Sequence, residues 1–500
     1  MVAALLAFVV YGDSIRGTFI FDDYLVILYD GRMPHPSLWG KFWTYPYVHS
    51  PDKPFRPLLS MSFAIQYWLH GQVGWPFHLV NILLHAAACA AVAELGRRLA
   101  GIRTAWFAGL LFAVHPVHIE AVANIVGRAE LACGLATISG LCLFLGRPLN
   151  GRRVAAICAC FVVAVLTKEQ GMLFPLLILA LTPFRFTGGI EPGERQPVRW
   201  LVVTLCYLLA GYVVYRELMI GFSWDRMFLE WVLNPLVRSR GIDRVLMPLV
   251  LIGRYAVLLV APHRLSVDYG GTAIGWVADP RDPYLYLGIA AVIAWLTGVV
   301  AVVRRRNWAA TFCLLGLALT YGMVGNIVAL IGPIFAERIM YLPSAFVLIL
   351  AGMAAAQVRR AAVIPVLTAL VLAGAMMTLW YVRLWNHPMA LFQHFIKNQP
   401  GSERVYDLLF REYAVRDDWR KAREIAGESI RAAPESDRPY EMCIDADLAM
   451  GEVADARAMY DSGMGACHGF ERLYLLPYGK KIESYRPADS SPQQAKGPPK

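Results

Sequence analysis

Long apolar stretches separated by short polar segments run through most of this chain, and they constrain its fold more than any other feature. Several of them reach the roughly 20 residues that an α-helix needs to cross a lipid bilayer. Only 17% of the 500 residues are charged, whereas soluble domains carry about 25%. We therefore predict an all-α fold in which residues 1–384 form a polytopic membrane helix bundle.

Arginine clusters mark one end of many apolar stretches, at residues 97–103, 147–153, 304–306 and 359–360. Cytoplasmic loops of membrane proteins are rich in Lys and Arg, so these clusters orient the predicted spans. The alternation gives about eleven crossings, with the N-terminus inside and the C-terminus outside. The stretch 245–260 is expected to be re-entrant or interfacial, because a crossing there would place residues 304–306 outside.

The net charge of +10 lies largely in these short basic loops. It therefore requires no nucleic acid as a partner, and the partners that the composition does imply are membrane lipids. The first apolar stretch lacks a basic leader and an A-x-A cleavage site, so we expect it to remain as an anchor.

Two adjacent aspartates, Asp22 and Asp23, follow the first apolar stretch in the sequence FIFDDY. Burial near a span and the neighbouring like charge should raise the pKa of at least one carboxyl group. A carboxylate with a raised pKa suits general-base catalysis. The two residues alone leave open a second interpretation, in which they are solvent-exposed charges that only mark the end of the membrane span.

Under the predicted topology, unusual polar residues from distant segments reach the same extracytoplasmic face as the aspartates. Ionisable residues near the ends of apolar spans are costly, so their convergence favours a functional site. The residues concerned are His115, His118, Glu120, Arg128, Glu130, Lys168, Glu169, Glu337, Arg338 and Tyr341.

These polar residues also have structural interpretations that the sequence leaves open. Lys168 and Glu169 could pair at the membrane interface. His115 and His118 could bind a metal ion together with Glu120, although buried histidines are more often hydrogen-bonded core residues.

The composition becomes that of a soluble helical protein after residue 384. Apolar positions at Leu409 and Ala422 recur 34 residues later at Cys443 and Ala456, which is the period of tetratricopeptide repeats. We predict two such repeats in residues 385–485, with an ordinary pair of helical hairpins as the alternative. Residues 486–500, rich in Pro, Ser, Gln and Lys, are expected to be disordered.

Four motifs of this chain together resemble a known family of membrane enzymes. They are the FDD element, HPVHIEAVANIVGRAE (residues 115–130), KEQG (168–171) and ERIMYLPS (337–344). In this order, with helical repeats after them, they resemble the transmembrane and tetratricopeptide repeat-containing O-mannosyltransferases of the type-C glycosyltransferase superfamily. LSVDY (265–269) fits the middle region of the family. The short repeat array and the Ala- and Arg-rich composition lead us to expect a bacterial relative in the inner membrane, with periplasmic repeats.

The resemblance implies transfer of a sugar, mannose in this family, from a polyprenyl or dolichyl-type phosphate to an acceptor hydroxyl, with inversion. The implied acceptor is a protein Ser or Thr, or a glycan, on the extracytoplasmic face. Asp22, or with slightly less weight Asp23, is the implied catalytic base. Arg338, Arg128 and Lys168 are the implied ligands of the donor phosphate, in that order.

Two questions remain open at the level of sequence. No cofactor is certain, although Glu120 and Glu130 could hold a divalent cation. A transporter and a non-catalytic scaffold are alternatives to an enzyme. The absence of an internal repeat among the spans and the gathering of charges at one face disfavour a transporter.

Overall fold

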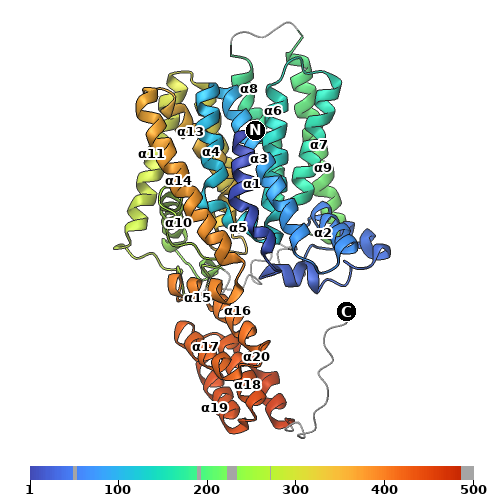
Figure 1. Ribbon diagram of the computed structural model, residues 1–500, viewed down its shortest axis with the longest axis vertical. Coiled ribbons are helices and arrows are strands. Elements are labelled where there is room, and N and C mark those ends of the chain that lie inside the picture. Colours follow the sequence, from blue (N-terminus) through green and yellow to red (C-terminus); the bar gives the residue numbers. More distant parts are fainter. Residues whose placement is uncertain (49–52, 188–192, 222–233, 271, 486–500) are drawn as a thin grey trace. The chain divides into compact units, whose positions relative to one another are not determined.

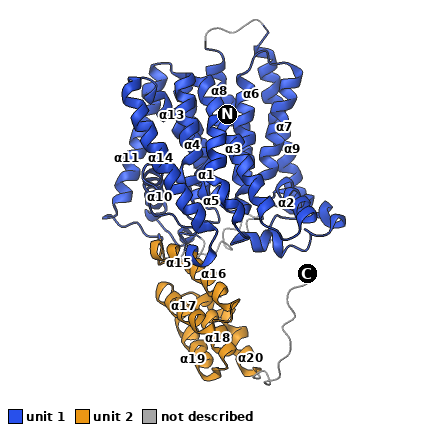
Figure 2. Cartoon of the chain, in the orientation of Figure 1, with its two compact units in different colours: residues 1–270, 274–391 blue, residues 271–273, 392–500 orange. Residues whose placement is uncertain are grey.

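The computed structural model describes residues 1–48, 53–187, 193–221, 234–270 and 272–485. The predicted disordered tail, residues 486–500, lies outside the described residues. The described part of the chain is helical and contains no strand. It divides into two compact units, the first of residues 1–270 and 274–391 and the second of residues 271–273 and 392–500 (Figure 2).

Unit 1 is a bundle of helices of very different lengths (Figure 1). Its helices are α1 (Val2–Tyr11), α2 (Pro57–His70), α3 (Trp75–Ala100), α4 (Ile102–Val114), α5 (Ile119–Ala123), α6 (Arg128–Leu145), α7 (Gly151–Thr167), α8 (Phe174–Arg185), α9 (Arg195–Ile220), α10 (Asp243–Val260), α11 (Pro283–Arg304), α12 (Trp308–Val324), α13 (Tyr341–Ala355) and α14 (Arg360–Trp385). One further helix, α15 (Pro388–Asn398), includes the boundary between the units.

Six helical segments of the described residues are long and apolar enough to cross a membrane, or seven if the bent pair α4 and α5 counts as one broken span. The segments are 75–100, 125–145, 195–220, 283–304, 337–355 and 360–385. The chain is thus an integral, multi-pass membrane protein.

The predicted count of eleven spans is not confirmed. The first apolar stretch is helical only from Val2 to Tyr11, and α8 has 12 residues. At 1.5 Å per residue these helices are about 15–18 Å long, which is short of a bilayer core of about 30 Å. α7 and α12, with 17 residues each, fall just below the length of a candidate span. Residues 245–260, expected to be re-entrant or interfacial, form part of one helix, α10, which is not among the candidate spans.

Small residues let the helices of the bundle approach one another closely. A Cβ atom added to Gly253 of α10 would overlap the carbonyl oxygen of Tyr284 in α11, and one added to Gly288 would overlap that of Leu249. Backbones in such contact pack through van der Waals attraction, which is the main force between helices where lipid replaces water. This pair of glycines therefore fixes α10 against α11.

The loop after the first helix is folded against the bundle. It contains η2 (Tyr24–Leu28), η3 (Pro36–Trp43) and α2. Side chains of this loop share one apolar cluster with Phe77 of α3 and Ala129 of α6; from the loop come Phe19, Val26, Ile27, Met33, Phe42, Tyr47, Leu59, Phe63 and Ala64. This cluster anchors the two aspartates, which lie within the same loop.

Unit 2 contains α16 (Glu403–Ala414), α17 (Trp419–Ala432), α18 (Asp437–Met450), α19 (Val453–Ala466) and α20 (Phe470–Glu483). α18 begins 34 residues after α16, and α19 begins 34 residues after α17. The repeating positions Leu409, Ala422, Cys443 and Ala456 are all buried. Two helical pairs therefore follow the period in the sequence, and their assignment as tetratricopeptide repeats stays a prediction.

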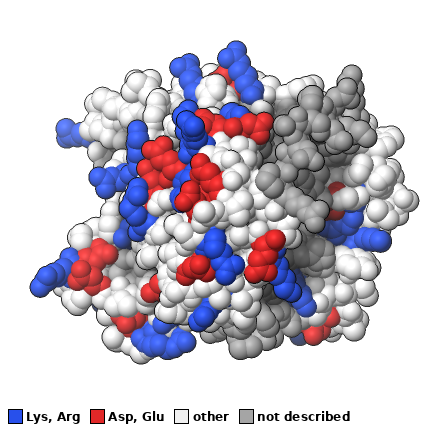
Figure 3. Space-filling view, turned by 90° about the horizontal axis from the view of Figure 1, so that it is seen from below, with Lys and Arg blue, Asp and Glu red and all other residues white. Residues whose placement is uncertain are grey.

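Ion pairs connect the helices of unit 2 to one another. Arg438 of α18 binds Asp407 of α16 at 2.6 Å, and Arg423 of α17 binds Asp447 of α18 at 2.5 Å. Figure 3 shows basic and acidic side chains lying beside one another on the face of the molecule that it views. Partly exposed pairs of this kind contribute at most about 1 kcal/mol each to stability, so they supplement the apolar packing of the helices.

Candidate functional site

The two aspartates lie on a sharp turn after the first helix. Phe21, directly before them, has a φ of +58°, a conformation that is costly for a residue with a bulky side chain. The Asp23 carboxylate accepts one hydrogen bond from the backbone N–H of Ile20 at 3.1 Å and another from that of Val126 at 3.0 Å. Asp23 thereby ties the turn to the short 3₁₀ helix η5 (Ile125–Gly127) directly before α6, 103 residues later in the chain.

Asp22 and Asp23 differ in their environments. Asp23 is fully buried, and burial, with a contribution from the charge of Asp22, raises its pKa to about 7. Asp22 is half-buried, so its carboxylate keeps some access to solvent. The geometry thus gives Asp23 a role in holding the turn and leaves Asp22 as the more accessible carboxylate.

Arg338 and Glu120 form an ion pair across 218 residues of sequence. The Nη1 atom of Arg338 donates to Glu120 Oε1, and the backbone N–H of Arg338 donates to Oε2 at 2.8 Å. Glu120 is buried, whereas the side chain of Arg338 is 20% exposed. The carboxylate of Glu120 thus orients a guanidinium that remains partly accessible.

Two further ion pairs join neighbouring segments. Lys168 Nζ donates to Glu130 Oε1. Arg56, which precedes α2, binds Glu169 through two nitrogens, with the closest contact at 2.8 Å. Burial would raise the pKa of Glu169, but the charge of Arg56 lowers it overall. KEQG therefore connects α6 to the loop that carries the aspartates.

Arg128 differs from the other predicted phosphate ligands, because its donors are already engaged. It donates to Asn81 Oδ1 at 3.0 Å, to Ser62 Oγ at 3.2 Å and to the carbonyl of Phe77 at 3.1 Å. The guanidinium is buried and lies over the ring of Phe63. Arg128 therefore holds α2, α3 and α6 together.

The ring nitrogens of the two histidines of HPVH bond to other groups, and the two rings lie 5.8 Å apart, centroid to centroid. The ring nitrogens of His115 contact the carbonyl of Leu259 and the N–H of Val117. Those of His118 contact the carbonyl of Phe112 and the hydroxyl of Ser344. Among the described residues, the structure places no three His, Cys, Asp or Glu side chains where they could hold a metal ion.

Glu337 and Tyr341 are buried on either side of Arg338. Glu337 Oε1 accepts from Tyr269 Oη at 2.6 Å and from the N–H of Ser266 at 2.7 Å. The Tyr341 hydroxyl lies 2.9 Å from His85 Nδ1. The LSVDY segment and α3 thus fix the turn that presents Arg338.

Electrostatic interactions connect these separate pairs. Arg338 lies within range of the charges of Glu120, Asp22 and Glu130. The charges of Asp22 and Asp23 also reach Tyr47, beside Arg56. Of the predicted site residues, the structure thus brings Asp22, Asp23, Glu120, Glu130 and Arg338 into one charged region. Lys168 joins this region through its ion pair with Glu130.

An apolar pocket of about 320 Å³ borders the turn of Arg338. Its wall comes from α10 to α13 and includes Met340, two residues after Arg338, and Tyr255, whose hydroxyl accepts from the N–H of Ala336 at 3.1 Å. The lining also includes Leu259, Ala291, Trp295, Ala318 and Val347. A charged region and a pocket with apolar walls therefore adjoin each other at residues 336–340.

Several residues of the region were not among those predicted from the sequence: Arg56, Asn81, His85, Ser266 and Tyr269. Arg56 stands between prolines in KPFRPL, and Asn81 and His85 are polar residues within an apolar helix. Such interruptions of an apolar pattern are the signal that could have identified them.

Comparison with known proteins gives a consistent group of relatives. No model of a protein family matches the chain. A protein O-mannosyl-transferase of Caenorhabditis elegans, F38B6.6, is 29% identical over 355 residues, covering 68% of this chain and 49% of the relative. Tmtc2 of Drosophila melanogaster is 31% identical (55% and 31% covered), and human TMTC4 is 27% identical (69% and 53% covered). The chain is similar to protein O-mannosyl-transferases.

The matches cover only part of each relative, and the relatives come from animals. The matched part of the chain spans about half or less of the length of these relatives. The relatives are eukaryotic, so they give no support to the predicted bacterial origin and inner-membrane location.

Among solved structures, the chain matches the archaeal oligosaccharyltransferase AglB from Archaeoglobus fulgidus, which was solved in complex with an inhibitory peptide and a dolichol-phosphate. The match has a TM-score of 0.42 and 13% identity, and it covers 81% of this chain and 59% of that one.

Proposed function

We propose that this chain is a membrane glycosyltransferase that moves mannose from a polyprenyl- or dolichyl-type phosphate to the hydroxyl of a protein Ser or Thr. The observation that carries the proposal is the charged region. In it, the turn of Asp22 and Asp23 is bound to Val126, just before α6, and lies within electrostatic range of Arg338. The similarity to protein O-mannosyl-transferases supports it.

Asp22 is the catalytic base in this proposal. An acceptor hydroxyl is a poor nucleophile until a positioned carboxylate takes its proton, which contributes roughly 10²–10⁴-fold in rate. Asp22 is the more accessible of the two aspartates, whereas Asp23 is buried and holds the turn. The oxygen of the acceptor attacks the anomeric carbon as the bond to the lipid phosphate breaks, so the transferred sugar has the inverted configuration.

Arg338 stabilises the negative charge that develops on the departing phosphate. Glu120 orients its guanidinium, and the exposed part of that group can donate to phosphate oxygens. Lys168, 10% exposed and paired with Glu130, contributes positive charge nearby. Arg128 keeps a positioning role, because its donors bind Asn81, Ser62 and Phe77.

The apolar pocket beside Arg338 binds the first isoprene units of the donor. The pocket is lined mainly by aliphatic and aromatic side chains, and it adjoins the residues proposed to bind the phosphate. A lipid phosphate needs this combination of a cationic group and an adjacent apolar wall. The proposed orientation places the site, and the repeats of unit 2, on the extracytoplasmic face.

The test is transfer by the purified full-length chain in proteoliposomes that contain polyprenyl-phosphate mannose. A Ser- and Thr-containing peptide is the acceptor, and the anomeric configuration of the product is read by NMR. We expect mannosylated peptide with the configuration opposite to that of the donor. Retention of configuration would contradict the proposed mechanism. No transfer to peptide, together with an unchanged donor, would favour a scaffold or transporter.

A further inference from the structure

A second pocket of unit 1 lies at the arginine-rich ends of α4 and α14. It has a volume of about 380 Å³ and is bounded by the start of α4, the segment after α13 and the start of α14. The candidate site adjoins the opposite ends of α4 and α13, since α13 begins at Tyr341 and ends at Ala355. Fifteen helical residues span about 22 Å, so this pocket is separate from the charged region of the aspartates.

The walls of this pocket are apolar and one edge is cationic. Arg103 and Arg360 come from helices that are more than 250 residues apart in sequence, and both line the pocket with exposed side chains. The walls consist of Ile102, Trp106, Phe107, Leu110, Ala355, Ala356, Val358, Val363, Ile364 and Leu367. The pocket thus presents two guanidinium groups beside a surface that suits a hydrocarbon chain.

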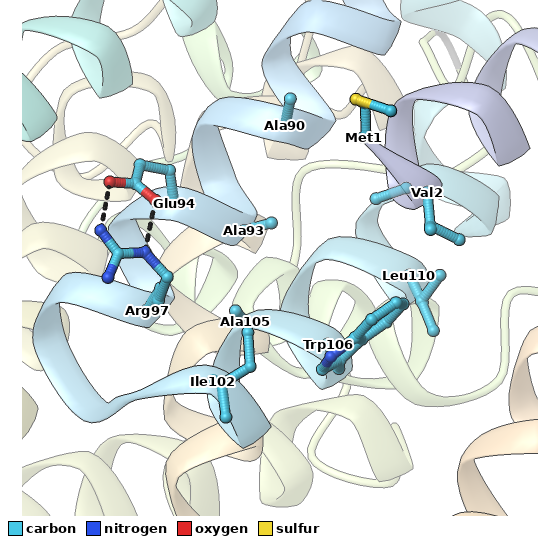
Figure 4. A pocket seen from close by; sticks show the side chains of 11 residues that line it. Met1, Val2, Ala90, Ala93, Glu94, Arg97, Ile102, Ala105, Trp106 and Leu110 are labelled. Carbon is cyan, nitrogen blue, oxygen red and sulfur yellow. Dashed lines mark hydrogen bonds and ion pairs between the residues drawn. The ribbon is translucent and has the colours of Figure 1, made fainter.

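The two arginines are available for a ligand. Arg103 donates one hydrogen bond, from Nη1 to the carbonyl of Ala356 at 3.1 Å, and among the described residues no carboxylate pairs with either arginine. A neighbouring pocket of about 200 Å³ provides a contrast, because it shares Ile102, Trp106 and Leu110 but contains Glu94 (Figure 4). Glu94 binds Arg97 at 2.7 Å, so the cation of that pocket is already neutralised.

The pocket faces the surroundings of the bundle. The most apolar 18-residue window of α14 is only 6% buried, and Ile364 is 60% exposed. A helix with such a surface lies against lipid in a membrane protein. An amphiphile from the bilayer can therefore reach the pocket from the side.

We propose that this pocket is a binding site for an anionic phospholipid of the membrane leaflet opposite the candidate active site. The phosphate binds between Arg103 and Arg360, and one acyl chain lies along Trp106, Leu110 and Leu367. Arginine matches phosphate oxygens through its planar pair of donors, and tryptophan is enriched at the level of the headgroups. Charge complementarity selects an anionic lipid over a zwitterionic one, whose own ammonium group would lie beside the arginines.

The experiment is native mass spectrometry of the full-length chain in detergent, titrated with phosphatidylglycerol or with phosphatidylcholine of the same acyl chains. We expect the wild-type protein to retain phosphatidylglycerol preferentially. The variant with both Arg103→Gln and Arg360→Gln should bind it at least about tenfold more weakly, since each basic group near a surface contributes about a factor of five. The matched control is Arg152→Gln, an exposed arginine outside this pocket, which should bind as the wild type does.

A second variant keeps the test independent of the charges. Ala355→Trp fills the apolar part of the pocket and leaves both arginines in place, so it should also lose the preferential binding while its thermal unfolding stays close to that of the wild type. Equal retention of the two lipids by the wild-type protein would overturn the proposal. Unchanged binding in the double arginine variant would overturn it too, as would displacement of the lipid by millimolar inorganic phosphate.

Discussion

At the scale of single residues, two neighbouring aspartates have different surroundings, and our proposal gives them different tasks for that reason. Asp23 is buried and accepts two backbone hydrogen bonds, and Asp22 beside it is half-buried. The sequence DD predicted a raised pKa for at least one of the two carboxyl groups, and only the family resemblance ranked Asp22 slightly above Asp23 as the base. Which of two adjacent side chains faces the interior depends on the turn at Phe21. The positive φ of Phe21 cannot be predicted from its residue type.

The raised pKa of Asp23 predicts a pH dependence of stability. Its folded-state pKa of about 7 lies above the usual value of 3.8, so the native state binds a proton more tightly than the unfolded state does. The stabilisation from this group is complete below about pH 4 and is lost as the pH rises through 7. Thermal unfolding of the wild type and of Asp23→Asn, measured from pH 4 to 8, should differ in slope over this window. Parallel curves would show that Asp23 ionises normally.

At the scale of elements, ion pairs between distant segments hold the site together. Glu120 follows the break between α4 and α5, and Arg338 lies in the turn before α13. The motifs HPVHIEAV and ERIMYLPS indicated that these residues matter. Their direct pairing could not be predicted, because the topology from the charge rule places many ionisable residues at one face without specifying partners.

Breaking this pair should destabilise unit 1. Glu120→Gln leaves the charge of Arg338 without its carboxylate, at a cost of about 3 kcal/mol, the low end of the range for buried pairs because Arg338 is 20% exposed. Glu94→Gln breaks the pair with Arg97, in which the Glu94 side chain is 34% exposed. It should lower the free energy of unfolding by about 1 kcal/mol or less. Urea unfolding of both variants in detergent checks the difference, and equal losses would contradict a special role for the Glu120 pair.

The apolar pocket gives a separate prediction about donor binding. Ala318→Trp fills part of the pocket that Met340 also lines. It should raise the KM for polyprenyl-phosphate mannose about tenfold, while the KM for the acceptor peptide stays unchanged. Ala354→Trp, on an exposed position of α13 outside this pocket, is the control. An equal rise in both KM values for Ala318→Trp would mean that the substitution disturbs the site in general.

At the scale of the whole molecule, the sequence predicted the helical membrane class of the fold better than it predicted the number of spans. The apolar composition of the bundle and the shift to a soluble composition after residue 384 are averages over many residues. A prediction based on them is therefore insensitive to where single helices end. The span count depends on where each helix ends, and breaks such as that after Tyr11 shorten α1 without interrupting the apolar pattern. The 34-residue spacing was visible because the same buried positions recur in both helical pairs.

Deletion of residues 402–469 tests the contribution of unit 2. If the helical pairs bind the acceptor polypeptide, the deletion should raise the KM for a protein acceptor at least about tenfold and leave hydrolysis of the donor by water unchanged. If the deletion changes the rate of transfer and the rate of donor hydrolysis by the same factor relative to the wild type, the repeats have another role. A short peptide acceptor serves as the control, because it gains little from an extended binding surface.

We propose that Asp22 removes the proton of the acceptor while Asp23 maintains the turn. The decisive measurement is the single-turnover rate of mannose transfer by Asp22→Asn, with its thermal unfolding recorded in the same preparation. We predict a rate lower by at least 10²-fold and a melting temperature equal to that of the wild type, whereas Asp23→Asn should change both. A wild-type rate in Asp22→Asn would contradict the account.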